Sequence, residues 1–178
     1  AAQGVSAYPA EVTRQMVGNF LAGGAAVSVL ARQHGLGLTV VDCGVAHDFA
    51  PQAGLVLAKV PGCAHGTADS SHGPAMSVAE AKEAMANGGH LVRSLPGNAL
   101  LLGEMGIANT SAASLLMARL TGLALSQCVG RGTGLDNAGL AHKQAVLQAA
   151  LAANAGAVQP LEVLAALGGL EIATMAGA

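Results

Sequence analysis

A glycine-containing turn between two apolar runs constrains the fold of this chain more than any other feature. The turn is Gly103–Ser111, and it lies between the apolar run Ala99–Leu102 and the Ala- and Leu-rich run Ala112–Leu120. This order predicts a buried strand, a turn and a helix. In an open α/β sheet such a turn lies at the carboxyl end of the strand, where ligands bind.

The turn carries groups that suit an anionic ligand. Gly103 and Gly106 have no Cβ, so the main chain can approach a ligand closely. Free N–H groups at the start of the helix attract an anion, and Asn109 and Thr110 add further donors there. Two interpretations of Glu104 stay open: a carboxylate at the reacting end of the site, or a cap for the helix.

A second turn, Gly130–Asp136, has similar chemistry. It follows the apolar segment Leu123–Val129, which we expect to be a strand, and it precedes a predicted helix, Ala138–Ala153, that carries Lys143. Glycines, hydroxyl donors and a fixed cation suggest a cradle for a phosphate or phosphoribosyl group. The turn is not a Walker loop, because no Gly-Lys-Ser/Thr triplet is present. It is not a dinucleotide fingerprint either, because Leu135 stands where the third glycine would be. The candidate ligand contacts here are Gly132, Thr133, Gly134 and Lys143.

These two turns closely resemble the glycine motifs of the nicotinate-nucleotide:dimethylbenzimidazole phosphoribosyltransferase family, which acts in cobalamin biosynthesis. The resemblance extends over nearly the whole chain, through the blocks Gly4–Pro9, Glu11–Val17, Asn19–Ala26, Val41–Val45, Gly66–Ala68, Pro74–Ser77 and Gly168–Ala173. It implies transfer of phosphoribosyl from nicotinate mononucleotide to 5,6-dimethylbenzimidazole, which yields α-ribazole 5′-phosphate and nicotinate. It implies no metal and no other cofactor.

The resemblance also implies roles for individual residues. The glycine turns, with Met105 and Lys143, would hold phosphate and ribose, Glu104 would lie near the reacting centre, and Gln15 would orient the benzimidazole. The alternatives are an ordinary solvated lysine at 143 and a partly exposed polar helix residue at 15. Ala108 departs from the family motif, which usually has glycine, and would cost roughly 1 kcal/mol if φ there is positive.

The two ends of the sequence suggest an internal fragment. The chain begins Ala1-Ala2-Gln3-Gly4 and stops at Ala178 in what reads as a helix, whereas family members have further segments at both ends. The C-terminal one supplies the catalytic general base. We therefore expect one domain over residues 1–178 that is inactive or very weakly active alone. The alternative function is a non-catalytic phosphate- or nucleotide-binding module.

Composition supports an α/β fold with a mostly parallel sheet flanked by helices in a Rossmann-like, three-layer arrangement. Hydrophobic residues make up 52% but aromatic residues only 2%, and 25 glycines allow close helix–sheet packing. A net charge of −2 without a basic patch argues against nucleic-acid binding, and no apolar run is long enough for a membrane span. Few charged residues suggest apolar surface buried against a partner subunit, and the resemblance suggests a homodimer. Cys43, Cys63 and Cys128 form no Cys-x-x-Cys pair, which favours small buried hydrophobic residues in a reducing cytoplasm.

The remaining pattern predicts further elements. After a loop over residues 1–10, we expect helices at Glu11–Leu21, Ala25–His34, Ser77–Asn87, Pro160–Leu167 and 170–178, and strands at Leu36–Val41 and Leu55–Val60. Ser77 and Glu80 form a predicted capping box, and Gly88-Gly89 should close that helix. Asp42 is either a functional residue at a strand end or a turn residue. Histidines and aspartates between 47 and 72 fit no compact metal motif, so we expect solvated loop residues.

Overall fold

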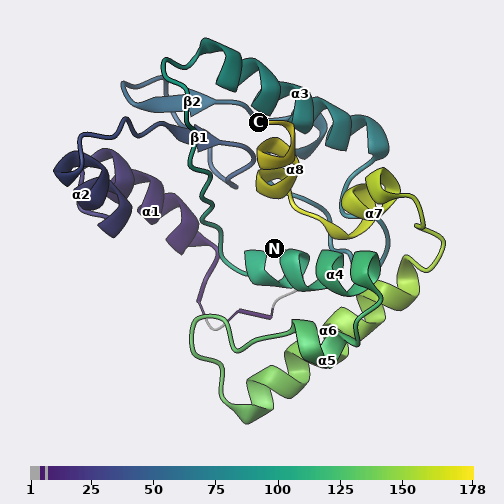
Figure 1. The fold of residues 1–178 in the computed structure, drawn as a ribbon. Helices are drawn as coiled ribbons and strands as arrows, with labels where there is room; N and C mark the ends of the chain where they lie inside the picture. Colours follow the sequence, from purple (N-terminus) through teal and green to yellow (C-terminus); the bar gives the residue numbers. More distant parts are fainter. Residues whose placement is uncertain (1–4, 7) are drawn as a thin grey trace.

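The computed structural model describes residues 5, 6 and 8–178, so residues 1–4 and 7 of the predicted N-terminal loop lie outside the described residues. Helices dominate the part that is described, and a small sheet lies toward one side of the molecule (Figure 1). In that part, no helix has the length and apolar character needed to cross a membrane. The elements in chain order are α1 (Glu11–Leu21), α2 (Ala26–Gln33), β1 (Val40–Asp42), β2 (Leu55–Leu57), the 3-10 helix η1 (Pro61–Cys63), α3 (Val78–Ser94), α4 (Asn109–Thr121), α5 (Leu125–Cys128), α6 (Asn137–Ala153), α7 (Pro160–Leu167) and α8 (Leu170–Gly177).

The sheet is parallel, as the α/β prediction requires. Val40 pairs with Leu55, Val41 with Val56 and Asp42 with Leu57. The α/β class and the parallel pairing are therefore confirmed, with a sheet of two strands in the described residues. The Rossmann-like, three-layer arrangement stays a prediction.

Two other predicted strands are wrong. The segment Ala99–Leu102 has no regular secondary structure and pairs with no strand in the described chain, and Leu101 is 82% exposed. The segment Leu123–Val129 instead contains the short helix α5, whose Cys128 carbonyl accepts a hydrogen bond from Ser114 Oγ. A strand needs a neighbour for its main-chain N–H and C=O groups. The structure provides no such neighbour to either segment, and an apolar run alone does not distinguish strand from helix.

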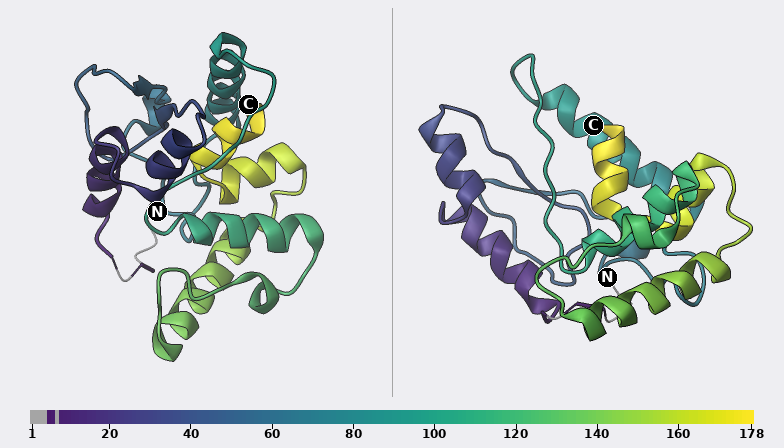
Figure 2. Two further views of the ribbon diagram at one scale, coloured as in Figure 1. Left: turned by 60° about the vertical axis from the view of Figure 1, so that its left-hand side comes forward. Right: turned by 60° about the horizontal axis from the view of Figure 1, so that its bottom comes forward.

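The close contact of α3 with α8 explains a third difference from the prediction. Helix α3 does not close at Gly88-Gly89 but continues to Ser94. A Cβ on Gly88 would clash with the carbonyl oxygen of Thr174, and a Cβ on Gly177 would clash with that of Met85. Both views in Figure 2 place α8 beside α3. These glycines are therefore required by helix packing and do not mark a helix end.

Helix ends follow local signals where the sequence contains them. The capping box of Ser77 and Glu80 is present at the start of α3. Asp136 Oδ1 accepts a hydrogen bond from Gly139 N–H at the start of α6, and Gly122 ends α4 with φ +73°. At the other end of α6, the Arg119 guanidinium donates to the carbonyl oxygens of Leu151, Ala155 and Ala157. Arg119 thereby fixes the helix that carries the candidate Lys143.

Candidate active site

The two glycine turns meet at one pocket. Its volume is about 170 Å³, and its lining comes from residues 104–111, from residues 131–133 and 135, from Lys143 and from the N-terminal residues Val5 and Ser6. A Cβ on Gly132 would lie 3.5 Å from Thr110 Oγ1 and 3.8 Å from Lys143 Nζ. A side chain at position 132 would therefore contact Thr110 and Lys143, and glycine leaves the space between the two turns open.

Lys143 is the buried cation of this pocket. Its side chain extends from α6, the residue is only 2% exposed, and Nζ donates to Thr110 Oγ1 at 2.8 Å and to Gly130 O at 3.4 Å. Burial lowers the pKa of Lys143 below its ordinary value. No carboxylate in the described part of the chain forms an ion pair with it. A buried ammonium without an anionic partner is costly, and a bound anion would offset that cost by supplying the negative charge.

The start of α4 adds hydrogen-bonding capacity that the described residues leave unused. Ser111 is completely buried, and its Oγ has no hydrogen-bond partner there although it lies at the pocket. The N–H groups of Asn109 and Ser111 donate locally, to Gly106 O and Ala108 O. Within the described contacts the N–H of Thr110 has no acceptor. The positive end of the helix dipole therefore faces the same pocket as Lys143.

Glu104 lies near the start of α4 but does not cap the helix, because α4 has no side-chain cap hydrogen bond, and its role at the reacting end stays a prediction. Its carboxylate accepts a hydrogen bond from Asn109 Nδ2, which holds the first residue of α4, and Glu104 also lines the pocket. The residue is exposed overall, but partial burial of its carboxyl group and then the negative charge of Glu171 raise the pKa of Glu104. A carboxyl group with a raised pKa is the stronger proton acceptor once it is ionised.

Ala108, which stands where the family motif usually has glycine, adopts the left-handed conformation. Its φ is +66° and its ψ is +12°, and it is the only non-glycine residue with positive φ in the described chain. It precedes α4 and provides no side-chain cap. Because φ at this position is positive, the methyl group of Ala108 carries a conformational cost that glycine would not.

Most of the predicted ligand contacts lie together, but three do not line the pocket. Gln15 is exposed on α1, while Gly103 and Gly134 flank the turns outside the lining. The predicted residues that do line it are Glu104, Met105, Gly106, Asn109, Thr110, Gly132, Thr133 and Lys143. The prediction did not include Val5, Ser6, Ile107, Ser111, Arg131 and Leu135 as ligand contacts. Ser6 lies in the block Gly4–Pro9 that carries the resemblance, so that block could have pointed to it.

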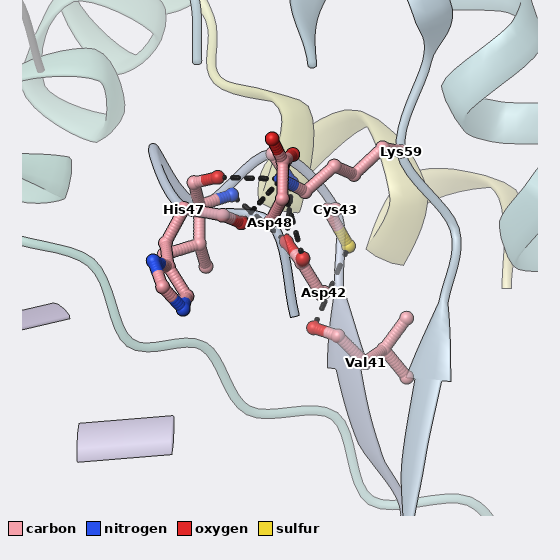
Figure 3. A network of polar contacts seen from close by, with 8 residues as sticks. Val41, Asp42, Cys43, His47, Asp48 and Lys59 are labelled. Atoms are coloured by element: carbon pink, nitrogen blue, oxygen red, sulfur yellow. Dashed lines mark hydrogen bonds and ion pairs between the residues drawn. The ribbon is translucent and has the colours of Figure 1, made fainter. Parts of the chain in front are cut away.

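Asp42 has a structural role away from this pocket (Figure 3). It is fully buried, and its Oδ1 accepts hydrogen bonds from the N–H groups of Gly44 and Val45 at 3.0 and 2.8 Å. The Lys59 ammonium lies 3.6 Å from Asp42 Oδ2 and donates to the carbonyl oxygens of Val45 and His47. Of the two interpretations of Asp42, the geometry supports the turn residue, because both carboxylate oxygens face groups that fix the loop after β1.

The family of the chain follows from comparison with known proteins. A family model described as phosphoribosyltransferase matches residues 1–178. The chain belongs to this family. This result confirms the resemblance that the two glycine turns indicated.

Individual relatives agree with the family model. The chain is 64% identical over 178 residues to the nicotinate-nucleotide–dimethylbenzimidazole phosphoribosyltransferase of Variovorax paradoxus, covering 100% of this chain and 50% of the relative. It is 58% identical to the enzyme of that name from Dechloromonas aromatica, covering 98% and 51%. The crystal structure of CobT from Thermus thermophilus matches with a TM-score of 0.89 and 43% identity, covering 98% and 53%. The chain thus spans about half the length of the curated relatives it matches.

Proposed function

We propose that the chain takes part in transfer of phosphoribosyl from nicotinate mononucleotide to 5,6-dimethylbenzimidazole, a step of cobalamin biosynthesis. The observation that carries this proposal is the buried Lys143 ammonium, which lies between the two glycine turns without an ion-pair partner in the described chain. A phosphate ester would supply the missing negative charge. The names of the relatives supply the substrate class.

In this proposal the two turns hold the phosphate and ribose from opposite sides. Lys143 and the start of α4, with the N–H of Thr110 and the hydroxyl of Ser111, bind the phosphate. The second turn closes over it at Gly132 and Thr133, where glycine allows close approach of the main chain. Met105, Gly106 and Asn109 complete the ribose side of the pocket.

The chemistry requires one bond to form and one to break at the anomeric carbon of the ribose. A ring nitrogen of dimethylbenzimidazole bonds to that carbon, and the bond to the pyridine nitrogen of nicotinate breaks. The electron pair of the broken bond neutralises the pyridinium, and the second ring nitrogen of the azole gives up its proton to a base. Glu104 is the carboxylate among the described residues that line the pocket, and we assign it to the reacting end. Gln15, which is exposed and outside the pocket, stays a prediction as an acceptor-binding residue.

Binding of nicotinate mononucleotide, measured by isothermal titration calorimetry, tests the proposal. Lys143→Met keeps the length of the side chain and removes its charge. It should weaken binding by roughly 10- to 100-fold, because it removes a charge-assisted hydrogen bond. Lys82→Met is the control, since Lys82 is exposed on α3 and should leave the affinity unchanged. Equal affinities for wild type and Lys143→Met would contradict the proposal.

The transfer itself is followed by chromatographic detection of α-ribazole 5′-phosphate and nicotinate. Nucleotide binding without release of nicotinate, both in this chain and in a full-length relative, would favour the binding-module alternative. The transferase is supported if the full-length relative binds the nucleotide and forms the product, and if it loses both when the lysine equivalent to Lys143 is replaced by Met.

Assembly and location belong to the same proposal. We propose a homodimer in the cytoplasm, because several large apolar side chains are exposed and the cysteines are unpaired. The exposed residues include Leu30 of α2 at 54% and Leu101 at 82%. Light scattering coupled to size-exclusion chromatography should give twice the mass of one chain. A strictly monomeric mass at micromolar concentration would contradict the dimer.

A further inference from the structure

One side-chain hydrogen bond joins the N-terminal helix to the first glycine turn. Thr13 lies in the first turn of α1, and its Oγ1 accepts a hydrogen bond from the N–H of Ile107 at 3.0 Å. The two residues are 94 positions apart in the sequence. In Figure 1 the first turn of α1 lies close to the segment that leads into α4.

The bond acts on the strained part of the turn. Ile107 immediately precedes Ala108, which has φ +66° and begins α4 without a side-chain cap. A left-handed alanine persists only where surrounding contacts determine the conformation. Thr110 and Ser111, whose groups face the pocket, follow directly along the chain. A change at Ala108 would therefore redirect the N–H groups at the start of α4.

We infer that Thr13 is a positioning residue for the anion-binding turn. Its hydrogen bond to Ile107 holds Ala108 in the left-handed conformation and so keeps Thr110 and Ser111 directed at the ligand. Thr13 does not line the pocket, so it acts through Ile107 and not on the ligand. The identity of the ligand rests on the proposed function, whereas the bond and its effect on the turn do not.

The test compares variants with and without the hydroxyl group at position 13. Thr13→Val has nearly the same shape but cannot accept the bond, whereas Thr13→Ser keeps the hydroxyl. Affinity for ribose 5-phosphate should fall roughly five-fold in Thr13→Val, which corresponds to the loss of one net hydrogen bond, and Thr13→Ser should restore it. Thr121→Val is the matched control, because it removes a hydroxyl that bonds to Met117 O and Leu123 N at the far end of α4.

The Ala108→Gly variant distinguishes a positioning role of Thr13 from a general effect of Thr13 on stability. Glycine adopts positive φ without cost, so Thr13→Val should weaken binding less in Ala108→Gly than in the wild type. Equal losses in both backgrounds would overturn the inference, as would unchanged affinity in Thr13→Val. If Thr13→Val fails to fold, Thr13→Ala replaces it in the same comparisons.

Hydrogen exchange at the Ile107 amide gives a readout that needs no ligand. Thr13→Val should raise its exchange rate several-fold, while Thr13→Ser and Thr121→Val should not. Unchanged exchange in Thr13→Val overturns the inference whatever the ligand is. If wild type binds no phosphate ester but its Ile107 exchange depends on Thr13, then the proposed function fails and the positioning role stands.

Discussion

Replacing Ala108 by glycine should stabilise the chain, although glycine normally weakens a structured segment. Ala108 has φ +66° and ψ +12°, in the left-handed region. An L-residue pays about 1–2 kcal/mol there. Glycine avoids that cost but adds about 0.4–1 kcal/mol of unfolded-state entropy. The balance is a gain of roughly 0.5–1 kcal/mol in the free energy of unfolding, since the alanine methyl is only partly buried.

Thermal unfolding by circular dichroism or calorimetry measures this gain. For a chain of this length the expected rise in Tm is about 1–4 °C. Ala113→Gly provides the matched control, because Ala113 is exposed inside α4 and the same chemical change there should destabilise by about 1 kcal/mol. If both variants lose stability to a similar extent, position 108 is not left-handed in solution and the reasoning is refuted.

Three further predictions concern packing, charge and exposure. Gly88→Ala should lower the free energy of unfolding by about 1–3 kcal/mol or abolish folding, because its Cβ would meet Thr174 O. Gly156→Ala should be nearly neutral, because there is open space around Gly156. Equal effects of the two substitutions in chemical denaturation would contradict the α3–α8 contact. Burial lowers the pKa of Lys143 below its ordinary value of 10.5. Above about pH 8, where phosphate is dianionic, affinity for ribose 5-phosphate should therefore fall as pH rises through that pKa, because the Lys143 cation is lost. If calorimetry shows the same decline in Lys143→Met, Lys143 is not its cause. Leu101→Ala should change the free energy of unfolding by less than about 0.5 kcal/mol, while Leu115→Ala should cost about 2–5 kcal/mol, and comparable losses would mean that Leu101 is buried.

Local signals predicted the helices well because the groups that end a helix are close to it in sequence. The pair Ser77 and Glu80 and the residue Gly122 each act within four residues of the helix end that they define. The course of α3 through Gly88 was not predictable in this way. It depends on Thr174, which approaches from another helix far along the chain. A glycine pair looks the same in sequence whether it ends a helix or allows a second helix to pack against it.

Strand prediction failed where pairing, which is not local, decides the outcome. The segment Ala99–Leu102 has the composition of a buried strand but finds no neighbour in the described chain. The run Leu123–Val129 is too short to distinguish strand from helix by its apolar pattern, and α5 forms there. Strands β1 and β2 overlap the strands predicted at Leu36–Val41 and Leu55–Val60, but each is shorter, and β1 extends to Asp42.

The candidate site was predictable where glycine, lysine and a carboxylate stand in recognisable turns. Glu104, Gly132 and Lys143 line one pocket, as the two motifs indicated. The contact between Thr13 and Ile107 was not predictable, because a threonine in an amphipathic helix gives no signal of a partner 94 residues away. The buried, unpartnered hydroxyl of Ser111 likewise becomes visible only in the folded structure.

The central claim is that the two glycine turns bind one phosphate ester together. Titration of the isotopically labelled chain with nicotinate mononucleotide, followed by amide ¹H–¹⁵N chemical shifts, tests it most directly. The amides of Thr110 and Ser111 in one turn and of Gly132 and Thr133 in the other should shift along curves that give a single Kd. Shifts confined to one turn, or two different Kd values, would contradict the account.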